Sequence, residues 1–337
     1  MPPDIPSSKG GSPESVQAPE TVELAEGSEE QNAVGGKISD DLEEVVELRV
    51  GDALTRSEAS QIMGSSRTQM LVIAGAVESG KTTLIASLFH LFQKGPFAGY
   101  CFAGSHTLVG FDMRCHMARI ASDRSAAHMP RTNPKEDRIF LHLRVRAENM
   151  DRPVKDLLIS DLSGEHYRDA KDSIEDCQKL GLISRADHFI LLIDGEKLIS
   201  LDKRQAAKAE ATMLLRCCVN AKQLGTSSLV DVLFTKWDLI ENSDDKPEHE
   251  QFASLIQESL AGQFGSRVGR LRFSKVVALR VLGKYPVGYG LDRPFPSWVE
   301  ESAASVLPER HVLVEPDSLT EFDRYLKRWL PRLFTEA

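Results

Sequence analysis

Short apolar runs separated by longer amphipathic stretches mark the chain from Gln69 onward. An apolar run bounded by turn residues is typical of a buried strand, whereas apolar residues three or four positions apart indicate a helix. Strands are therefore predicted at residues 70–74, 138–146, 156–160, 189–193, 229–234 and 273–281. Helices are predicted at residues 57–63, 82–92, 108–122, 203–222, 248–263 and 319–330.

Strands that alternate with helices need crossover connections, which produce a parallel sheet covered by helices on both faces. The pattern therefore predicts an α/β fold, a three-layer sandwich around a mostly parallel, six-stranded sheet. The stretch 94–134 separates the first helix of this fold from its second strand. It is long for such a connection, and long connections are usually functional or contain structure of their own.

Composition divides the chain into three parts. Residues 1–47 contain 12 acidic and 2 basic side chains, which accounts for the whole net charge of −9. Their richness in Pro, Ser, Gly and Glu predicts a disordered acidic tail. Residues 48–68 are expected to form a short helical lead-in, and residues 69–335 the folded domain. Because that domain is close to neutral, nothing in it predicts binding to nucleic acid.

The expected compartment is the cytoplasm. No apolar run approaches the length of about 18 residues needed to cross a bilayer. Residues 1–12 lack the apolar core of a secretory signal, and neither a lipidation signal nor another membrane anchor is visible. The five cysteines show no disulfide-framework spacing, which fits reduced thiols.

A phosphate-binding loop lies between the strand at 70–74 and the helix at 82–92. Residues 75–82 read GAVESGKT and match the P-loop, or Walker A, pattern G-x-x-x-x-G-K-[ST]. Such a loop directs successive backbone N–H groups at one anion, and the helix N-terminus adds positive potential. The residues expected to bind phosphate are Gly75, Val77, Glu78, Ser79, Gly80, Lys81, Thr82 and Thr83.

Two side chains of this loop have specific expected tasks. Lys81 should reach the β- and γ-phosphates and assist catalysis, and the Thr82 hydroxyl should ligate Mg²⁺. A second motif, D-x-x-G, follows the strand that ends at Ser160. Its Asp161 is expected to hold Mg²⁺ through a water and its Gly164 N–H to contact the γ-phosphate. The alternative is an ordinary Asp/Gly turn.

A third motif, Thr235-Lys236-Trp237-Asp238, comes at the end of the strand at 229–234. A carboxylate can accept both the N1–H and the exocyclic amine of guanine, a donor pair that adenine lacks. Asp238 is therefore the expected guanine ligand, with Thr235 beside it and the Lys236 stem along the purine plane. The three motifs together predict GTP or GDP rather than ATP.

These motifs, in this order, resemble the Ras-like, translation-factor-related class of P-loop GTPases over about residues 69–335. The resemblance implies the P-loop NTPase fold, with GTP or GDP and Mg²⁺ as ligands. It also implies a threonine that reaches the metal just before the second strand. Thr132 is the expected residue, and Thr107 is the second choice.

The same class contacts the base through a loop of S-A-K type after its last strand. Residues 277–280 read VALR here, so Ala278 matches, and the backbone N–H of Ala278 or Leu279 is expected to contact the base. The class also has a Gln directly after the D-x-x-G glycine. This chain has Glu165 and then His166, which are candidates to orient or deprotonate the attacking water; a surface turn is the alternative.

A narrower resemblance connects the chain with the bacterial double-GTPase family of conflict or defence loci. It is carried by residues 82–88, 95–100, 107–111 and 130–132, together with the second and third motifs. It implies that residues 94–134 elaborate switch I, where one arginine could act on the phosphate charge: Arg114, Arg119 or Arg131.

The resulting expectation is a slow, Mg²⁺-dependent GTPase switch that acts through a protein effector or a companion protein of the system. The alternatives are a P-loop ATPase or nucleotide kinase and a non-hydrolysing nucleotide-binding scaffold. The sequence contains no recognisable acceptor-substrate site or lid motif of a nucleotide kinase.

Overall fold

The computed structural model describes residues 51–123, 139–149, 152–279 and 285–300. All of them belong to the second of the two units into which the chain divides, Leu48–Ala337. The expected acidic tail, the helix at 319–330 and the switch-I candidate Thr132 lie outside the described residues. No helix in the described part of the chain is long and apolar enough to cross a bilayer.

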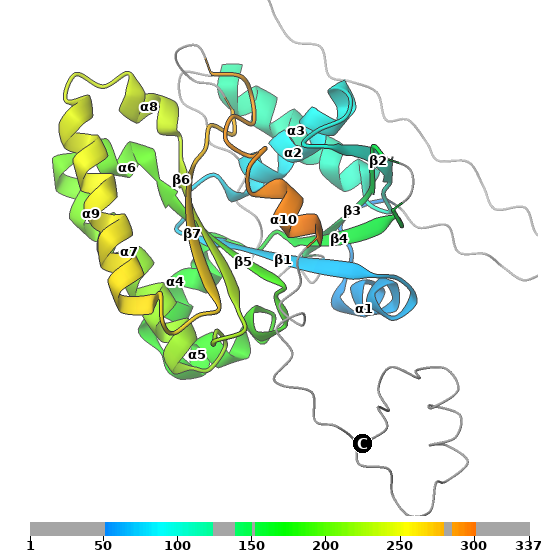
Figure 1. The fold of residues 1–337 in the computed structure, drawn as a ribbon, viewed down its shortest axis with the longest axis horizontal. Coiled ribbons are helices and arrows are strands. Elements are labelled where there is room, and N and C mark those ends of the chain that lie inside the picture. Colours follow the sequence, from blue (N-terminus) through cyan, green and yellow to red (C-terminus); the bar gives the residue numbers. More distant parts are fainter. Residues whose placement is uncertain (1–50, 124–138, 150–151, 280–284, 301–337) are drawn as a thin grey trace, which may run out of the picture. The chain divides into compact units, whose positions relative to one another are not determined.

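A seven-stranded sheet lies at the centre of this unit, in the order β2-β3-β4-β1-β5-β6-β7 (Figure 1). Five neighbouring strands, β4, β1, β5, β6 and β7, pair in parallel, and the pairs β2–β3 and β3–β4 are antiparallel. The strands are β1 (Thr68–Gly75), β2 (Tyr100–Gly104), β3 (Phe140–Ala147), β4 (Lys155–Ser160), β5 (His188–Asp194), β6 (Leu229–Thr235) and β7 (Arg270–Lys275).

The α/β class and the mostly parallel sheet are confirmed, but the expected number of six strands is one too few. The additional strand is β2, within the long stretch 94–134. β2 forms an edge of the sheet, and of its five residues Tyr100 alone is buried. Because an edge strand with little buried surface does not need alternating apolar residues, no period-2 pattern marks it in the sequence.

Helices cover both faces of the sheet (Figure 1). One face packs against α2 (Lys81–Lys94), α3 (Leu108–Asp123) and α10 (Phe295–Glu300). The other packs against α1 (Arg56–Ser65), α4 (Gly164–Asp172), α5 (Ile174–Lys179), α6 (Gly195–Ile199), α7 (Leu201–Asn220), α8 (Trp237–Glu241) and α9 (Lys246–Phe264). A short 3₁₀ turn, η1 (Ile183–Arg185), precedes β5.

The strand β1 shows how this arrangement follows from its residues. Met70 and Val72 belong to the apolar cluster beneath α7 and α9, whereas Leu71 and Ile73 belong to the cluster beneath α2 and α3. Successive side chains of a strand point to opposite faces, so an unbroken apolar run indicates a strand covered on both sides. Because β1 is buried between the two helix layers, the loop that follows it is fixed at the carboxyl end of the strand, between those layers.

Helix α3 is held against α2 and the sheet at two points. Phe111 stacks on Phe89 of α2, with ring centroids 4.7 Å apart and planes 10° from parallel. Gly110 lies so close to β3 that a Cβ there would approach Leu141 Cδ2 to 2.9 Å. This packing fixes the backbone of α3 beside the start of α2.

Candidate nucleotide-binding site

The loop between β1 and α2 has the tightly curled backbone that phosphate binding requires. Gly75, Glu78 and Gly80 all have positive φ, of 155°, 67° and 93°. At Gly75, an added Cβ would be 3.0 Å from the Leu192 carbonyl oxygen of β5, so only glycine fits. Gly80 has no side chain to cap α2, whose first N–H groups can therefore serve an anion.

Lys81 holds this loop closed through two hydrogen bonds. Its Nζ donates to the carbonyl oxygens of Gly75 at 3.0 Å and Ala76 at 2.9 Å. Burial lowers the pKa of Lys81 to about 8, although the nearby Asp161 carboxylate works in the opposite direction. The ammonium group is thus poorly solvated and has a strong electrostatic preference for an anion nearby.

Thr82 and Asp161, the two described residues expected at the metal, lie together. The Thr82 hydroxyl donates to Asp161 Oδ1 at 3.3 Å. Asp161 follows β4, and its side chain is 2% exposed. The other oxygen, Oδ2, accepts from Arg114 Nε of α3 at 2.6 Å. A hydroxyl and a carboxylate oxygen are ligands that Mg²⁺ accepts, so this pair fits the ion.

The remaining switch-I candidates are placed in different ways. Thr107 is fully buried, and its hydroxyl accepts from the His142 backbone N–H at 2.9 Å, which ties the start of α3 to β3. The side chain of Arg119 and all of Arg131, like Thr132, lie outside the described residues. Of the three candidate arginines, Arg114 is therefore the one that the structure locates.

The D-x-x-G turn packs directly against the P-loop. A Cβ added to Gly164 would lie 2.7 Å from the Val77 backbone nitrogen, so a side chain is excluded at this position. Ser163 caps α4 by accepting from the Glu165 N–H at 3.3 Å. Glu165 and His166 are both half-buried in the first turn of α4. His166 Nδ1 is buried and has no hydrogen-bond partner among the described residues.

The third motif is attached to the P-loop by its first residue. Thr235 Oγ1 donates to the Ser79 carbonyl oxygen at 2.9 Å and lies 3.2 Å from the Ile193 carbonyl oxygen. Asp238 is fully buried at the start of α8. Lys236 adopts the left-handed conformation with φ of 49°, which turns the chain from β6 into that helix.

Two acidic residues that the sequence interpretation missed contact Lys236. Its Nζ donates to Asp194 Oδ2 at 3.0 Å and Glu196 Oε2 at 2.6 Å. Burial works against the charged amine, but these two ion pairs prevail and raise the pKa of Lys236. The sequence did contain a sign that Asp194 lies near the site, because Asp194 directly follows the predicted strand at 189–193. The pairing itself joins segments about 40 residues apart, which a local pattern does not reveal.

The loop after β7 lies next to the third motif. The Trp237 N–H donates to the Val276 carbonyl oxygen at 3.2 Å. Ser87 Oγ of α2 donates to the Ala278 carbonyl oxygen at 2.7 Å. Ala278 and Leu279 thus stand between α2 and α8, and residues 280–284 lie outside the described part. The two segments expected to contact the base are therefore neighbours.

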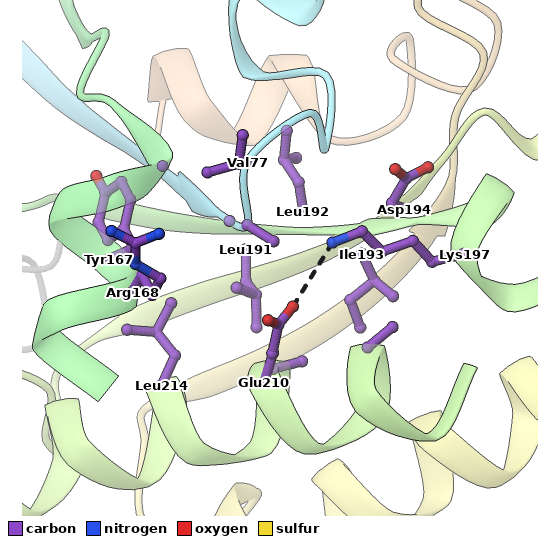
Figure 2. A pocket seen from close by; sticks show the side chains of 15 residues that line it. Val77, Tyr167, Arg168, Leu191, Leu192, Ile193, Asp194, Lys197, Glu210 and Leu214 are labelled. Carbon is purple, nitrogen blue, oxygen red and sulfur yellow. Dashed lines mark ion pairs between the residues drawn. The ribbon is translucent and has the colours of Figure 1, made fainter. Parts of the chain in front are cut away.

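A cavity of about 230 Å³ lies behind the P-loop, between α4, β5 and α7 (Figure 2). Val77 approaches it from the P-loop and Leu191 from β5, while Tyr167 borders it from α4. At its rim, Lys197 Nζ is 3.7 Å from Glu210 Oε2. Most of the lining is apolar, but the cationic side chains of Arg168 and Lys197 also border the cavity.

The P-loop, the D-x-x-G turn and the T-K-x-D segment at the carboxyl ends of β1, β4 and β6 define a P-loop GTPase fold. A comparison with family models gives the narrower assignment. The model of the Double-GTPase 2 family matches residues 69–299, and the chain belongs to that family. The resemblance to double-GTPases is thus confirmed.

The solved structures that match this chain include an elongation factor and a GTPase-like domain. A bacterial selenocysteine-specific elongation factor EF-Sec is 19% identical, with a TM-score of 0.31; the match covers 63% of this chain and 26% of that one. The S. cerevisiae Ski7 GTPase-like domain bound to GDP and inorganic phosphate is 16% identical, with a TM-score of 0.39 and coverages of 76% and 54%.

The same Ski7 domain bound to GTP is 15% identical, with a TM-score of 0.37 and coverages of 72% and 51%. This chain therefore spans about a quarter of the length of the first of these proteins and about half of the second. A search of curated proteins gave no match.

Proposed function

We propose that this chain is a GTP-controlled switch that binds GTP or GDP with Mg²⁺ and slowly hydrolyses GTP to GDP and phosphate. The observation that carries the proposal is the direct contact between three motifs that are far apart in the sequence. The Thr235 hydroxyl bonds to the Ser79 carbonyl at 2.9 Å, and Gly164 packs against Val77. The proposed phosphate site, γ-phosphate sensor and base site thus lie in direct contact.

Phosphate binding rests on Lys81 and on the backbone N–H groups of residues 75–83. The Lys81 ammonium group donates to two carbonyl oxygens of its own loop. Phosphate oxygens carry more negative charge than carbonyl oxygens, so they draw the ammonium to the β- and γ-phosphates. Gly164 then contributes its N–H to the γ-phosphate, which distinguishes GTP from GDP.

Thr82 and Asp161 are the residues proposed to hold Mg²⁺, and Thr132 remains the proposed switch-I ligand. The support is the pair of oxygen donors joined at 3.3 Å. When bound, the ion neutralises charge that develops on the phosphate oxygens. The protein side chains then have the tasks of orienting the nucleotide and excluding stray water.

Guanine selection is assigned to Asp238, supported by Thr235, Lys236 and the backbone of Ala278 and Leu279. Asp238 is fully buried, and a buried carboxylate gains more from two N–H donors than an exposed one does. Thr235 acts as a brace, since its hydroxyl is already bonded to the P-loop.

Water activation is assigned to Glu165 and His166 at the start of α4. Both stand next to Gly164 and so close to the proposed γ-phosphate site. The carboxylate of Glu165 is repelled by a nucleotide that carries about four negative charges, whereas a neutral Gln at this position is not. We therefore propose slow intrinsic hydrolysis that a protein partner accelerates.

The proposed setting is a bacterial conflict or defence system, in which the chain acts on an effector or a companion GTPase-system protein. Its support is the family resemblance noted above, and the GTP-bound form is the proposed signal. The region that changes most directly with the γ-phosphate is the turn at Gly164 and α4, which makes this region the proposed effector contact.

Phosphate release at saturating GTP and Mg²⁺ tests hydrolysis. Wild-type protein should turn over slowly, and Lys81→Ala should lower the rate by about 100-fold or more because it removes a positioned cation from the phosphates. Glu165→Gln keeps the side-chain shape and removes the repelling charge, so a changed hydrolysis rate in this variant supports a role of Glu165 in water activation. A wild-type rate equal to that of Lys81→Ala contradicts hydrolysis and favours the scaffold alternative.

A further inference from the structure

The carboxylate proposed to hold Mg²⁺ already has a cationic partner within the chain. Arg114 of α3 donates from Nε to Asp161 Oδ2 at 2.6 Å, and its Nη1 donates to the Gly110 carbonyl oxygen at 3.0 Å. The two charged side chains are 11% and 2% exposed. An ion pair shielded to this degree is much less weakened by solvent and salt than a surface pair.

Both oxygens of this carboxylate are engaged within the chain. Oδ2 accepts from Arg114, and Oδ1 accepts from the Thr82 hydroxyl at 3.3 Å. The guanidinium group and a metal ion held by Thr82 and Asp161 must therefore draw on the same carboxylate. Two cations at one buried carboxylate repel each other, so the guanidinium group and the metal ion compete for Asp161.

We propose that Arg114 is a built-in counter-ion of Asp161, which Mg²⁺ displaces when the nucleotide binds. This inference rests on the proposed function, since it takes Asp161 as a residue of the metal site. Without Arg114 the buried carboxylate of Asp161 loses its hydrogen-bonded cation, which is costly. Arg114 thus stabilises the empty form and raises the Mg²⁺ concentration that nucleotide binding requires.

Because α3 is firmly packed, the exchange of Arg114 for Mg²⁺ at Asp161 requires movement of the Arg114 side chain only. Phe111 stacks on Phe89 at 4.7 Å, and Gly110 lies against β3, so the helix backbone near Arg114 is fixed from both sides. A guanidinium on a long side chain can leave the carboxylate while the helix stays in place. The contact between Arg114 and Asp161 therefore links α3, within the stretch 94–134, directly to the proposed metal site.

The test is a Mg²⁺ titration of fluorescent GDP binding to the full chain, with Arg114→Gln and Arg114→Lys compared with wild type. Arg114→Gln removes the cation that competes with Mg²⁺ for Asp161, together with its charge-assisted hydrogen bond. The half-saturating Mg²⁺ concentration of this variant should therefore be about tenfold lower than that of wild type. Arg114→Lys keeps a cation and should fall between the two. The metal-free thermal midpoint of Arg114→Gln should also be lower than that of wild type.

Arg144→Gln is the matched control. Arg144 Nε donates to Asp156 Oδ1 at 2.6 Å, the same contact at the other end of β4 from Asp161. This variant should lose thermal stability without any change in the Mg²⁺ requirement. An unchanged or higher Mg²⁺ requirement in Arg114→Gln overturns the proposal, whatever its stability.

Failure of the proposed function gives a different result. If wild-type protein does not bind GDP at any Mg²⁺ concentration, the proposal of guanine nucleotide binding is wrong. The competition between Arg114 and Mg²⁺ for Asp161 is then tested with Mg²⁺ alone. Mg²⁺ without nucleotide should raise the thermal midpoint of Arg114→Gln more than that of wild type. Equal shifts in the two proteins reject the competition between Arg114 and the metal.

Discussion

Lys81 combines two tasks that follow from its burial. Its ammonium group donates to the Gly75 and Ala76 carbonyl oxygens, which keeps the P-loop curled. The same burial lowers its pKa to about 8, so the amine is protonated at neutral pH and loses its proton in mildly alkaline solution. A bound phosphate favours the charged form and raises the pKa again.

The affinity for GDP should therefore depend on pH through Lys81. Below about pH 8 the free protein is already protonated, and affinity should be constant. Above it, binding requires the uptake of a proton, so affinity should fall by up to about tenfold per pH unit. Dissociation constants measured between pH 7.5 and 9 check this expectation.

Lys81→Met is the matched control for the pH series. It lacks the Lys81 amine, but the nucleotide and all other residues titrate as they do with wild-type protein. Its affinity should be low and should vary less with pH than that of wild type. A wild-type affinity that stays flat to pH 9 would show that the Lys81 ammonium is not drawn to the phosphates.

The sequence motifs indicated that residues of the P-loop and the D-x-x-G turn lie close together, but they did not indicate the partner of Lys236. Thr82 and Asp161 were expected at one metal and lie 3.3 Å apart. Lys236 was expected along the purine, but its pairing with Asp194 was not foreseen. Its partner lies on a neighbouring strand, and only the register of β5 against β6 brings the two together.

Helix α4 and the P-loop meet through a glycine. Any Cβ at position 164 would come within 2.7 Å of the Val77 nitrogen, a distance that backbone atoms do not tolerate. The start of α4 consequently packs directly against the P-loop backbone. A γ-phosphate on the Gly164 N–H, as proposed, would therefore act directly on the first turn of α4.

Gly164→Ala should separate α4 from the P-loop. The added methyl group must push the turn away, so the N–H loses its proposed γ-phosphate contact while GDP binding is retained. The thermal shift caused by a non-hydrolysable GTP analogue should fall to that caused by GDP. A wild-type difference between the two nucleotides in this variant would show that Gly164 does not sense the γ-phosphate.

Gly181→Ala serves as the control for this substitution, since an added Cβ there meets no atom within 4 Å. Its response to both nucleotides should match that of wild type. A loss of response in both variants would point to a general effect on folding.

The sequence pattern predicts elements where burial is two-sided and misses them where it is slight. The strand β5 is buried at every position and was predicted nearly in full. The strand β2 exposes Phe102 and Ala103 and was not predicted. The helix α3 was predicted from its spacing, but its contact with Asp161 depends on how it packs across α2.

The whole sheet explains why three distant motifs form one site. In the order β2-β3-β4-β1-β5-β6-β7, β1 lies between β4 and β5 (Figure 1). The carboxyl ends of parallel strands meet at one edge, and ligands of open α/β sheets bind there. The loops at residues 75–82, 161–164 and 235–238 all follow strands at that edge. Topology, which no single motif contains, creates the nucleotide site.

Base selectivity tests the proposed GTP switch most directly, by titration calorimetry of GTP, ATP and XTP in Mg²⁺ with wild type and Asp238→Asn. Wild type should prefer GTP over ATP by about 100-fold or more, because adenine leaves the buried carboxylate unmatched. An amide offers one donor and one acceptor, which suits the C2 carbonyl and N1–H of xanthine, so Asp238→Asn should prefer XTP. Equal wild-type affinity for GTP and ATP, or an unchanged preference in Asp238→Asn, would contradict guanine recognition by this site.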